Sequence, residues 1–349
     1  MQLVMAEDAT SEQVEEVTVT LRRIGLEPAL VRGGRSTRIS LAGSHGGVGS
    51  LRLELLAGVV RIIEASQPFT KASWEFCDQP TVVELANATR IGGREVVVMA
   101  GACPLEPEER MVEVAHAARA AGATLLYGGV FGPGGEPHSG PRCTERALRL
   151  LARAREETGM AIVAEALDAE SAGILAEYVD ILQLGPDNMQ NFPLLRGAAR
   201  LGKPVLLVRG PVATITELLQ AAEYVLAEGN GDAILCEAGV LHPSSEGRRV
   251  LDLAAVPVIK ALSHLPVVVW PGCSDPAATT AMACAAIAAG ADGVTVEIRS
   301  TPGEPHAADR TGALDPAGFT GAVRQLRQLA AAVGRGLAAP LAREPAIAP

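Results

Sequence analysis

Aromatic residues are scarce in this sequence, with Trp, Tyr and Phe making up only 3% of its 349 residues. Hydrophobic residues nevertheless reach 48%, so the core must be built from aliphatic side chains. No apolar run reaches the roughly 18 residues that a membrane-spanning helix needs, and no basic leader with an apolar stretch opens the chain. These absences predict a cytoplasmic protein without a membrane partner.

Positive charge is also in short supply. Lys and Arg number 30 against 40 Asp and Glu, which gives a formal net charge of -10. Proteins that bind nucleic acids or anionic membranes carry concentrated Lys and Arg instead. The acidic balance therefore argues against a nucleic acid partner and favours a small-molecule substrate.

Cysteines are few, and none form a Cys-x-x-Cys pair. In a chain of this length without secretory signals, they are expected to be reduced thiols. Most buried cysteines pack as small hydrophobic residues, which is the role expected for Cys236 and Cys284. The remaining cysteines are Cys77, Cys103, Cys143 and Cys273.

From residue 96 onward, short apolar runs alternate with helical patterns, which is typical of parallel strands joined by crossover helices. Eight βα units in about 240 residues predict a (β/α)8 TIM barrel over residues 96–333. The expected strands are 96–101, 124–128, 161–165, 181–184, 205–208, 233–236, 267–270 and 293–298.

The barrel is expected to be flanked by three other segments. Residues 1–67 read as strand, helix, strand, strand, helix and strand, a ferredoxin-like βαββαβ domain whose second helix covers 49–56. Residues 68–95 form a linker, in which the apolar run 81–85 is expected to cap the floor of the barrel. Residues 334–349 have no periodicity and predict a disordered tail.

Barrel enzymes place reactive residues at or just beyond the C-terminal ends of their strands. Cysteine and carboxylate side chains that arrive there from neighbouring strands suit a divalent metal, although such residues also often bond only to local backbone. The polar residues at these positions are Cys103, Glu165, Gln183, Asp187, Asn188, Gln190, Asn191, Arg209, Glu237, Cys273, Glu297 and Asp309.

Several short motifs follow one another along the chain: MAGAC at 99–103, GGVF at 128–131, EAL at 165–167, AEYVDILQLG at 176–185, NMQNF at 188–192, ILCE at 234–237, LDLAAVP at 251–257 and SHLP at 263–266. In order and spacing they resemble the type I beta group of 3-deoxy-D-arabino-heptulosonate 7-phosphate (DAHP) synthases. The resemblance implies an eight-fold barrel with an N-terminal ferredoxin-like domain, which in family members can bind an aromatic amino acid. It also implies a homo-oligomer, a dimer or tetramer.

Family members condense phosphoenolpyruvate with erythrose 4-phosphate at a divalent metal held by a cysteine, a histidine, a glutamate and an aspartate. The resemblance carries the cysteine to Cys103, the glutamate to Glu297 and the aspartate to Asp309. The histidine of the family's Asp-Pro-Ser-His-Ser is replaced by Cys273 in WPGCS at 270–274. A second thiolate would favour zinc or iron, with manganese or cobalt as further possibilities.

This sequence departs further from the family in the motifs that bind phosphate. The family's Arg-Gly-Gly-Ala-Tyr-Lys-Pro-Arg-Thr-Ser reads YGGVFGPGGE at 127–136, its Ala-Arg-Asn reads PDN at 186–188, and its Cys-Glu-Arg-Gly reads CEAG at 236–239. Its Lys-Arg-Gly reads VRG at 208–210, so Arg209 alone is retained. Since each charge-assisted contact to phosphate contributes about 1.5–3 kcal/mol, ordinary DAHP synthesis is not expected.

The leading hypothesis is a metal-dependent enzyme, repurposed for aldol-type or related carbon–carbon chemistry on a 2-oxo acid or another substrate without phosphate, in specialised metabolism. Glu165 or Glu237 would be the catalytic base, and Arg209 is predicted to be a catalytic and substrate-binding residue. A metal bound near Arg209 would chelate the carboxylate and keto oxygen of the 2-oxo acid. The alternative for either glutamate is a purely structural bond to backbone or to the retained arginine. The other predicted substrate-binding residues are Tyr127, Gln183, Asp187, Asn188 and Trp270.

Two other functions stay open on the sequence. One is a non-catalytic relative that binds a ligand or regulates, which the loss of the cations favours. The other is DAHP synthase activity itself, in aromatic amino acid biosynthesis, through a rearranged site.

Overall fold

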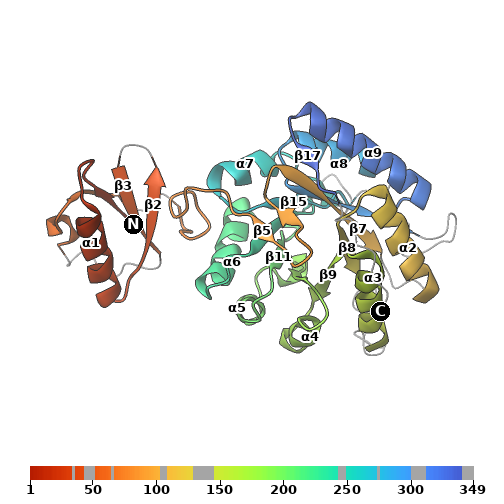
Figure 1. The fold of residues 1–349 in the computed structure, drawn as a ribbon, viewed down its shortest axis with the longest axis horizontal. Coiled ribbons are helices and arrows are strands. Elements are labelled where there is room, and N and C mark those ends of the chain that lie inside the picture. The colour runs from red at the N-terminus through yellow and green to blue at the C-terminus, as the bar shows by residue number, and fades with distance from the viewer. Residues whose placement is uncertain are drawn as a thin grey trace, which may run out of the picture. The chain divides into compact units, whose positions relative to one another are not determined.

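The computed structural model describes residues 1–33, 36–42, 52–63, 67–102, 108–128, 145–242, 249–272, 276–299 and 312–339. These residues form two compact units (Figure 1). The first contains Met1–Pro80 and Leu262–His264, and the second contains the other described residues.

The first unit is a four-stranded antiparallel sheet with a helix on one face. The sheet has the order β2-β3-β1-β4. Leu3, Ile39 and Leu41 of the sheet share a closed apolar core with Val17 and Leu21 of the helix. This is the predicted ferredoxin-like arrangement. Its elements are β1 (Gln2–Met5), α1 (Ser11–Arg23), β2 (Glu27–Gly33), β3 (Ser36–Ala42) and β4 (Val59–Ile63).

The second helix predicted for this unit is shorter than expected. Of the range 49–56, residues 52–56 are described, and only Leu53–Leu55 form a 3-10 helix. Leu53 is buried against the core of the unit, whereas Leu55 is 68% exposed. One buried side chain gives a short segment little reason to extend into a full helix.

The second unit is a closed barrel of parallel strands. Each strand pairs with the next along the chain, and the last returns to the first, from Gly293 beside Val97 to Glu297 beside Gly101. This confirms the predicted (β/α)8 barrel. Its strands are β7 (Glu95–Ala102), β8 (Leu125–Gly128), β9 (Ala161–Ala166), β10 (Ile181–Leu184), β11 (Val205–Val208), β12 (Ala233–Glu237), β15 (Val267–Val269) and β16 (Gly293–Glu297).

Helices follow the strands and lie around the outside of the barrel (Figure 1). The fourth begins only at Phe192, because Pro186–Asn188 form a separate 3-10 helix and Asn191 caps the helix proper. The helices are α2 (Glu108–Ala121), α3 (Glu145–Thr158), α4 (Ala169–Leu175), α5 (Phe192–Arg200), α6 (Ile215–Ala227), α7 (Ala255–Leu262), α8 (Pro276–Ala288) and α9 (Pro316–Ala332).

The interior of the barrel is filled by aliphatic side chains, as the scarcity of aromatic residues predicted. Every strand except β16 contributes one or two residues to one buried cluster, among them Val97, Leu125, Val163 and Leu206. At the N-terminal end, the short hairpin of β5 (Val83–Glu84) and β6 (Arg90–Ile91) adds Val83 and Ile91 to the same cluster. The apolar run at 81–85 therefore caps the floor of the barrel.

The chain beyond α9 differs from the predicted disordered tail in its first residues. Gly336 and Leu337 form β17, which pairs with β7 at Glu95 and Val96. Arg335 donates to Asp292, and Lys260 donates to the same buried carboxylate at 2.7 Å. These contacts give residues 334–339 a fixed place that their sequence pattern does not reveal.

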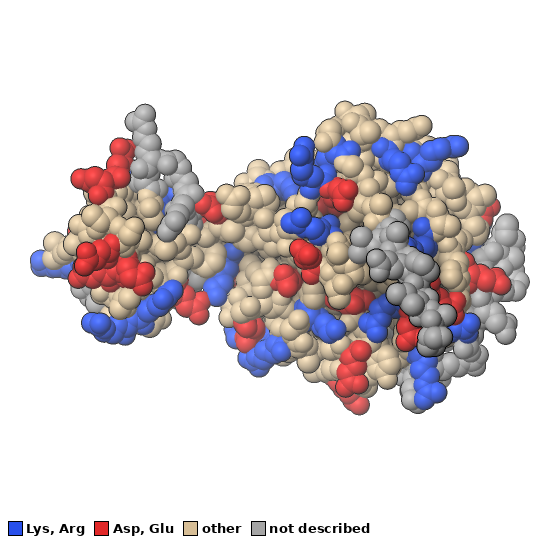
Figure 2. All heavy atoms as spheres, viewed as in Figure 1, with Lys and Arg blue, Asp and Glu red and all other residues tan. Residues whose placement is uncertain are grey.

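Basic and acidic side chains are interspersed over the face of the molecule that Figure 2 shows. Within the described ranges, no helix is long and apolar enough to cross a membrane.

Candidate active site

The top layer of the barrel interior carries polar side chains. Side chains of a strand alternate between its two faces, so a residue two positions beyond a core residue also points inward. Glu165 follows the core residue Val163 in this way, and Gln183 follows Ile181. The two lie beside each other in the register of β9 and β10. A glutamate and a glutamine therefore share the C-terminal mouth of the barrel.

The side chains of Glu297 and Tyr127 also lie in this top layer of the barrel interior, on the two strands that flank Gly101. Gly101 pairs with Glu297 on β16 and with Tyr127 on β8. A Cβ atom at Gly101 would lie 3.3 Å from Cγ of Glu297 and 3.7 Å from Cδ1 of Tyr127. The missing side chain of Gly101 thus lets these two side chains approach one another.

An aromatic pair closes the top of the aliphatic core. The rings of Tyr127 and Trp270 have centroids 5.4 Å apart and are inclined at 58°. They come from β8 and from the end of β15, which are not neighbouring strands, so the rings meet across the interior. They separate the core of the barrel from its mouth.

The carboxylate of Glu165 lies against Gly185 and Tyr127. It lies so close to Gly185 that any side chain at that position would collide with it, and Tyr127 donates a hydrogen bond to it. Burial and then the negative charge of Asp187 raise the pKa of Glu165, against the opposing effects of Tyr127 and Arg249. A carboxyl group with a raised pKa is a stronger base once it is ionised.

Both polar atoms of the Asn188 side chain form hydrogen bonds with other residues of the protein. Its Nδ2 donates to the carbonyl of Leu167 at 3.2 Å, and its Oδ1 accepts from Asn191 at 3.0 Å. These two bonds join the loop after β9 to the start of α5. Asn188 therefore has a structural task that the sequence prediction of substrate binding did not include.

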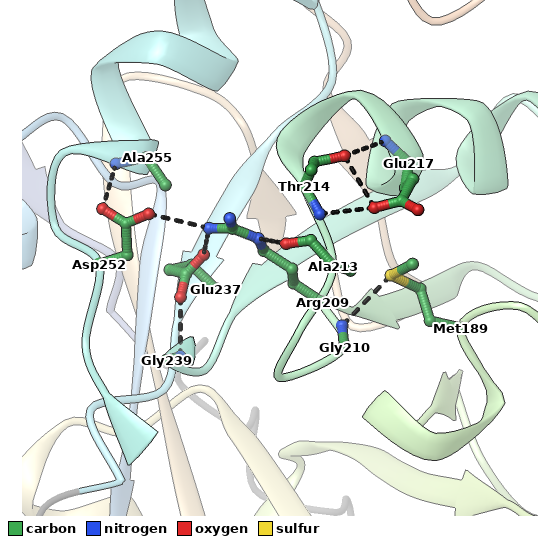
Figure 3. A network of polar contacts seen from close by, with 10 residues as sticks. All are labelled: Met189, Arg209, Gly210, Ala213, Thr214, Glu217, Glu237, Gly239, Asp252 and Ala255. Carbon is green, nitrogen blue, oxygen red and sulfur yellow. Dashed lines mark hydrogen bonds and ion pairs between the residues drawn. The ribbon is translucent and has the colours of Figure 1, made fainter. Parts of the chain in front are cut away.

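Arg209 lies in a buried ionic network (Figure 3). Its Nη1 donates to Glu237 at 2.8 Å and to Asp252 at 3.1 Å, and its Nε donates to the carbonyl of Ala213 at 2.8 Å. Burial alone would lower the pKa of Arg209, but its contacts with Glu237 and Asp252 outweigh burial and raise it. The guanidinium stays charged and is committed to protein partners.

Glu237 points away from the interior of the barrel. Its neighbours Cys236 and Ala238 both belong to the interior cluster, so the side chain between them faces outward. The carboxylate is fully buried and accepts from Gly239 N at 2.7 Å as well as from Arg209. Of the two interpretations left open for Glu237, the structure favours a carboxylate held by the retained arginine.

Two protein-family models match this chain and show which family it belongs to. A model of the DAHP synthetase I family matches residues 80–332, and a model of the DAHP synthase ferredoxin-like domain matches residues 1–67. The chain belongs to the DAHP synthetase I family.

Individual relatives agree. Phospho-2-dehydro-3-deoxyheptonate aldolase of Thermotoga maritima is 35% identical over 336 residues, which cover 96% of this chain and 99% of the relative. 2-Dehydro-3-deoxyphosphooctonate aldolase of Magnetococcus marinus is 28% identical over 226 residues, or 59% of this chain and 78% of the relative. The crystal structure of the Thermotoga maritima aldolase (DAHP synthase) gives a TM-score of 0.74 at 33% identity, covering 97% of this chain and 98% of that one. The predicted family is confirmed, and the chain is an enzyme of aldolase type.

The site residues predicted for this DAHP synthase relative fall into two groups. Tyr127, Glu165, Gln183 and Glu297 converge on the mouth of the barrel, with Trp270 opposite. Arg209 and Glu237 form a separate network with Asp252. The sequence did not reveal Asp252, or Arg249 as the cation that acts on Glu165, because neither lies at the end of a barrel strand.

The structure describes one of the four predicted metal ligands. Glu297 is 4% exposed at the end of β16, whereas Cys103, Cys273 and Asp309 lie outside the described residues. Among the side chains that the structure does describe, no three His, Cys, Asp or Glu groups gather so that they could hold a metal ion. The four-ligand set therefore stays a prediction.

The Glu165→Gln variant is expected to be more stable than the parent at high pH. A carboxyl group whose pKa is raised in the folded state stabilises the fold below its unfolded pKa, and this contribution is lost as the pH rises through the folded pKa. Glutamine carries no charge and avoids the loss. We expect the melting temperature to rise by about 2 °C or more at pH 8 and to be unchanged at pH 4.

Thermal unfolding of both proteins across this pH range measures the difference. Glu177→Gln, which alters an exposed carboxylate at the other end of the barrel, is the control and should give no such trend. A variant that is equally stable or less stable at pH 8 would contradict the burial of an ionisable Glu165.

Proposed function

We propose that this chain is a metal-dependent enzyme that joins a 2-oxo acid to an aldehyde without phosphate. The observation that supports this most is the state of Arg209. It is the cation retained from the family's phosphate-binding motifs, and its guanidinium is bound to Glu237, Asp252 and a backbone carbonyl. A phosphate would have to displace these buried partners.

The metal site that we propose consists of Cys103, Cys273, Glu297 and Asp309. Glu297 suits this role because its buried carboxylate lies beside Gly101, on the strand that leads to Cys103. Two thiolates and two carboxylates are good donors for zinc or ferrous iron, with manganese or cobalt less favoured. A metal held by these residues would supply Lewis-acid chemistry for a keto group.

Glu165 is the proposed general base. It would take a proton from the carbon beside the keto group, and that carbon would then form the new bond to the aldehyde carbon. The aldehyde oxygen would take up a proton in exchange and become a hydroxyl group, so that no oxidant or reductant is needed. The raised pKa of Glu165 and its position beside Gln183 support this assignment. Tyr127 and Trp270 would form the floor beneath the substrates.

A second candidate is DAHP synthase activity itself. The 35% identity to the Thermotoga maritima aldolase over 96% of this chain favours it. This reading requires that phosphate be held without the arginines and the lysine that the family motifs carry. The predicted cytoplasmic location, the homo-oligomer and the place in specialised metabolism stay predictions under either candidate.

Phosphate release separates the two candidates. With phosphoenolpyruvate and erythrose 4-phosphate, we expect less than about a thousandth of the rate of the Thermotoga maritima enzyme assayed alongside, since two or three lost contacts of about 1.5–3 kcal/mol each suffice for that. With pyruvate and unphosphorylated aldehydes, we expect mass spectrometry to find the summed product. A phosphate release rate within about tenfold of the relative would instead support DAHP synthase activity.

A further inference from the structure

The amide of Gln183 is the most unusual polar group in the mouth of the barrel. Its side chain is 1% exposed, and its Nε2 has no hydrogen-bond partner among the residues that the structure describes. A buried donor without an acceptor is costly, typically by about 1–3 kcal/mol. Because Gln183 points into the mouth beside Glu165, an oxygen atom of a bound ligand is a natural acceptor.

In the part of the chain that the structure describes, the charged groups near this amide are mainly negative. Glu165 lies beside Gln183 in the sheet register, and the exposed Asp187 is close enough to act on the charge of Glu165. Arg249 acts on Glu165 more weakly than Asp187 does. Among the described residues that act on one another here, the carboxylates of Glu165 and Asp187 outnumber the exposed cation Arg249, a balance that repels an anionic ligand and attracts a cationic one.

The aromatic pair also favours a cationic ligand. Trp270 is partly buried and Tyr127 is 5% exposed at the floor of the mouth. Faces and edges of such rings give apolar contact to carbon, and the faces attract ammonium groups within about 6 Å of a ring centroid. A ligand that pairs an ammonium group with an oxygen acceptor would satisfy the carboxylates, the rings and the amide together.

We propose that this mouth binds an amine-bearing, hydroxylated compound, with its ammonium group at Asp187 and Glu165 and an oxygen atom at Gln183 Nε2. The inference rests on the proposed function, because this compound would be the aldehyde partner of that reaction. It names the chemical class of the acceptor as amino sugars or small hydroxylated amino aldehydes. The ammonium group would lie where a phosphorylated acceptor would place its phosphate. A phosphate there would need positively charged protein side chains.

Calorimetric titration of the full-length protein with three matched sugars tests this. D-Glucosamine, D-glucose and D-glucose 6-phosphate present a cation, a neutral group and an anion on one ring. Glucosamine should bind at least about tenfold more tightly than glucose, as one charge-assisted contact provides, and glucose 6-phosphate should bind most weakly. Equal binding of glucosamine and glucose, or preferred binding of the phosphate, would overturn the proposal.

Two variants assign the preference to residues. Asp187→Asn should bring the glucosamine preference down to about twofold or less, because the rim carboxylate is lost. Gln183→Leu should weaken glucosamine and glucose alike, because both use the oxygen contact. Glu177→Gln is the matched control and should leave the preference unchanged. An Asp187→Asn protein that keeps the full preference would refute the placement of the ammonium group.

Binding requires no turnover, so this experiment can fail separately from the proposed function. Product from pyruvate and a neutral aldehyde, together with equal binding of glucosamine and glucose, would overturn only the acceptor class. Rapid phosphate release from phosphoenolpyruvate and erythrose 4-phosphate would overturn the proposed function, whatever the titration showed.

Discussion

Replacing Arg209 with methionine is expected to cost about 3–5 kcal/mol of folding stability, the usual effect of breaking a buried ion pair. Methionine fills a similar volume, but it leaves Glu237 buried with one backbone donor, Gly239 N. Asp252 is 32% exposed and can be hydrated, so Glu237 accounts for most of the cost. Equilibrium unfolding in urea, followed by circular dichroism, measures the loss.

The double variant Arg209→Met/Glu237→Gln separates charge from shape. Glutamine can still accept from Gly239, and no buried charge remains, so most of the lost stability should return. The matched control is Arg153→Met, which breaks a half-exposed pair with Glu157 and should cost less than about 1 kcal/mol. If Arg209→Met costs no more than this control, the network is not a structural one and Arg209 is available to a substrate.

Replacing Glu297 with alanine is expected to abolish both metal retention and product formation. The proposed site loses one of its four ligands, and the three that remain bind a divalent ion more weakly. We expect metal content to fall from about one ion per chain to well below it, and the rate to fall at least about a thousandfold. Elemental analysis of protein purified without chelator measures the first effect, and the pyruvate–aldehyde assay measures the second.

Thr295→Ser is the control for the strand. Thr295 lies two residues earlier on β16, also inside the barrel, and its hydroxyl contacts Met99. This variant should keep both metal and activity. Metal content that is unchanged in Glu297→Ala would remove Glu297 from the ligand set. A parent protein that holds no metal and whose melting temperature does not respond to chelator would remove the metal altogether.

The sequence predicted the barrel closely because buried parallel strands are continuous apolar runs. The same rule placed Glu165, Gln183, Arg209 and Glu237 together as residues at strand ends. It does not tell which face of a strand a residue occupies. Glu165 continues the inward face of β9, whereas Glu237 falls on the outward face of β12, and that difference separates the mouth from the ionic network.

Long-range partners were beyond the reach of the sequence. Asp252 precedes α7, where an aspartate is expected simply as a helix cap, and its carboxylate does accept from Ala255 N. Its second partner, Arg209, is 43 residues away along the chain. The order of residues 334–339 was missed for a similar reason, since β17 depends on pairing with β7 and on Arg335 reaching Asp292.

The buried network of Arg209, Glu237 and Asp252 also bears on how such an enzyme can change over generations. A lineage that loses Arg209 or Glu237 alone passes through a poorly folded intermediate. Single substitutions of these two residues are therefore selected against. Asp187 sits on the exposed rim, where exchanging one side chain for another disturbs little else in the fold. Selection can therefore alter what enters the barrel while the scaffold beneath it stays the same.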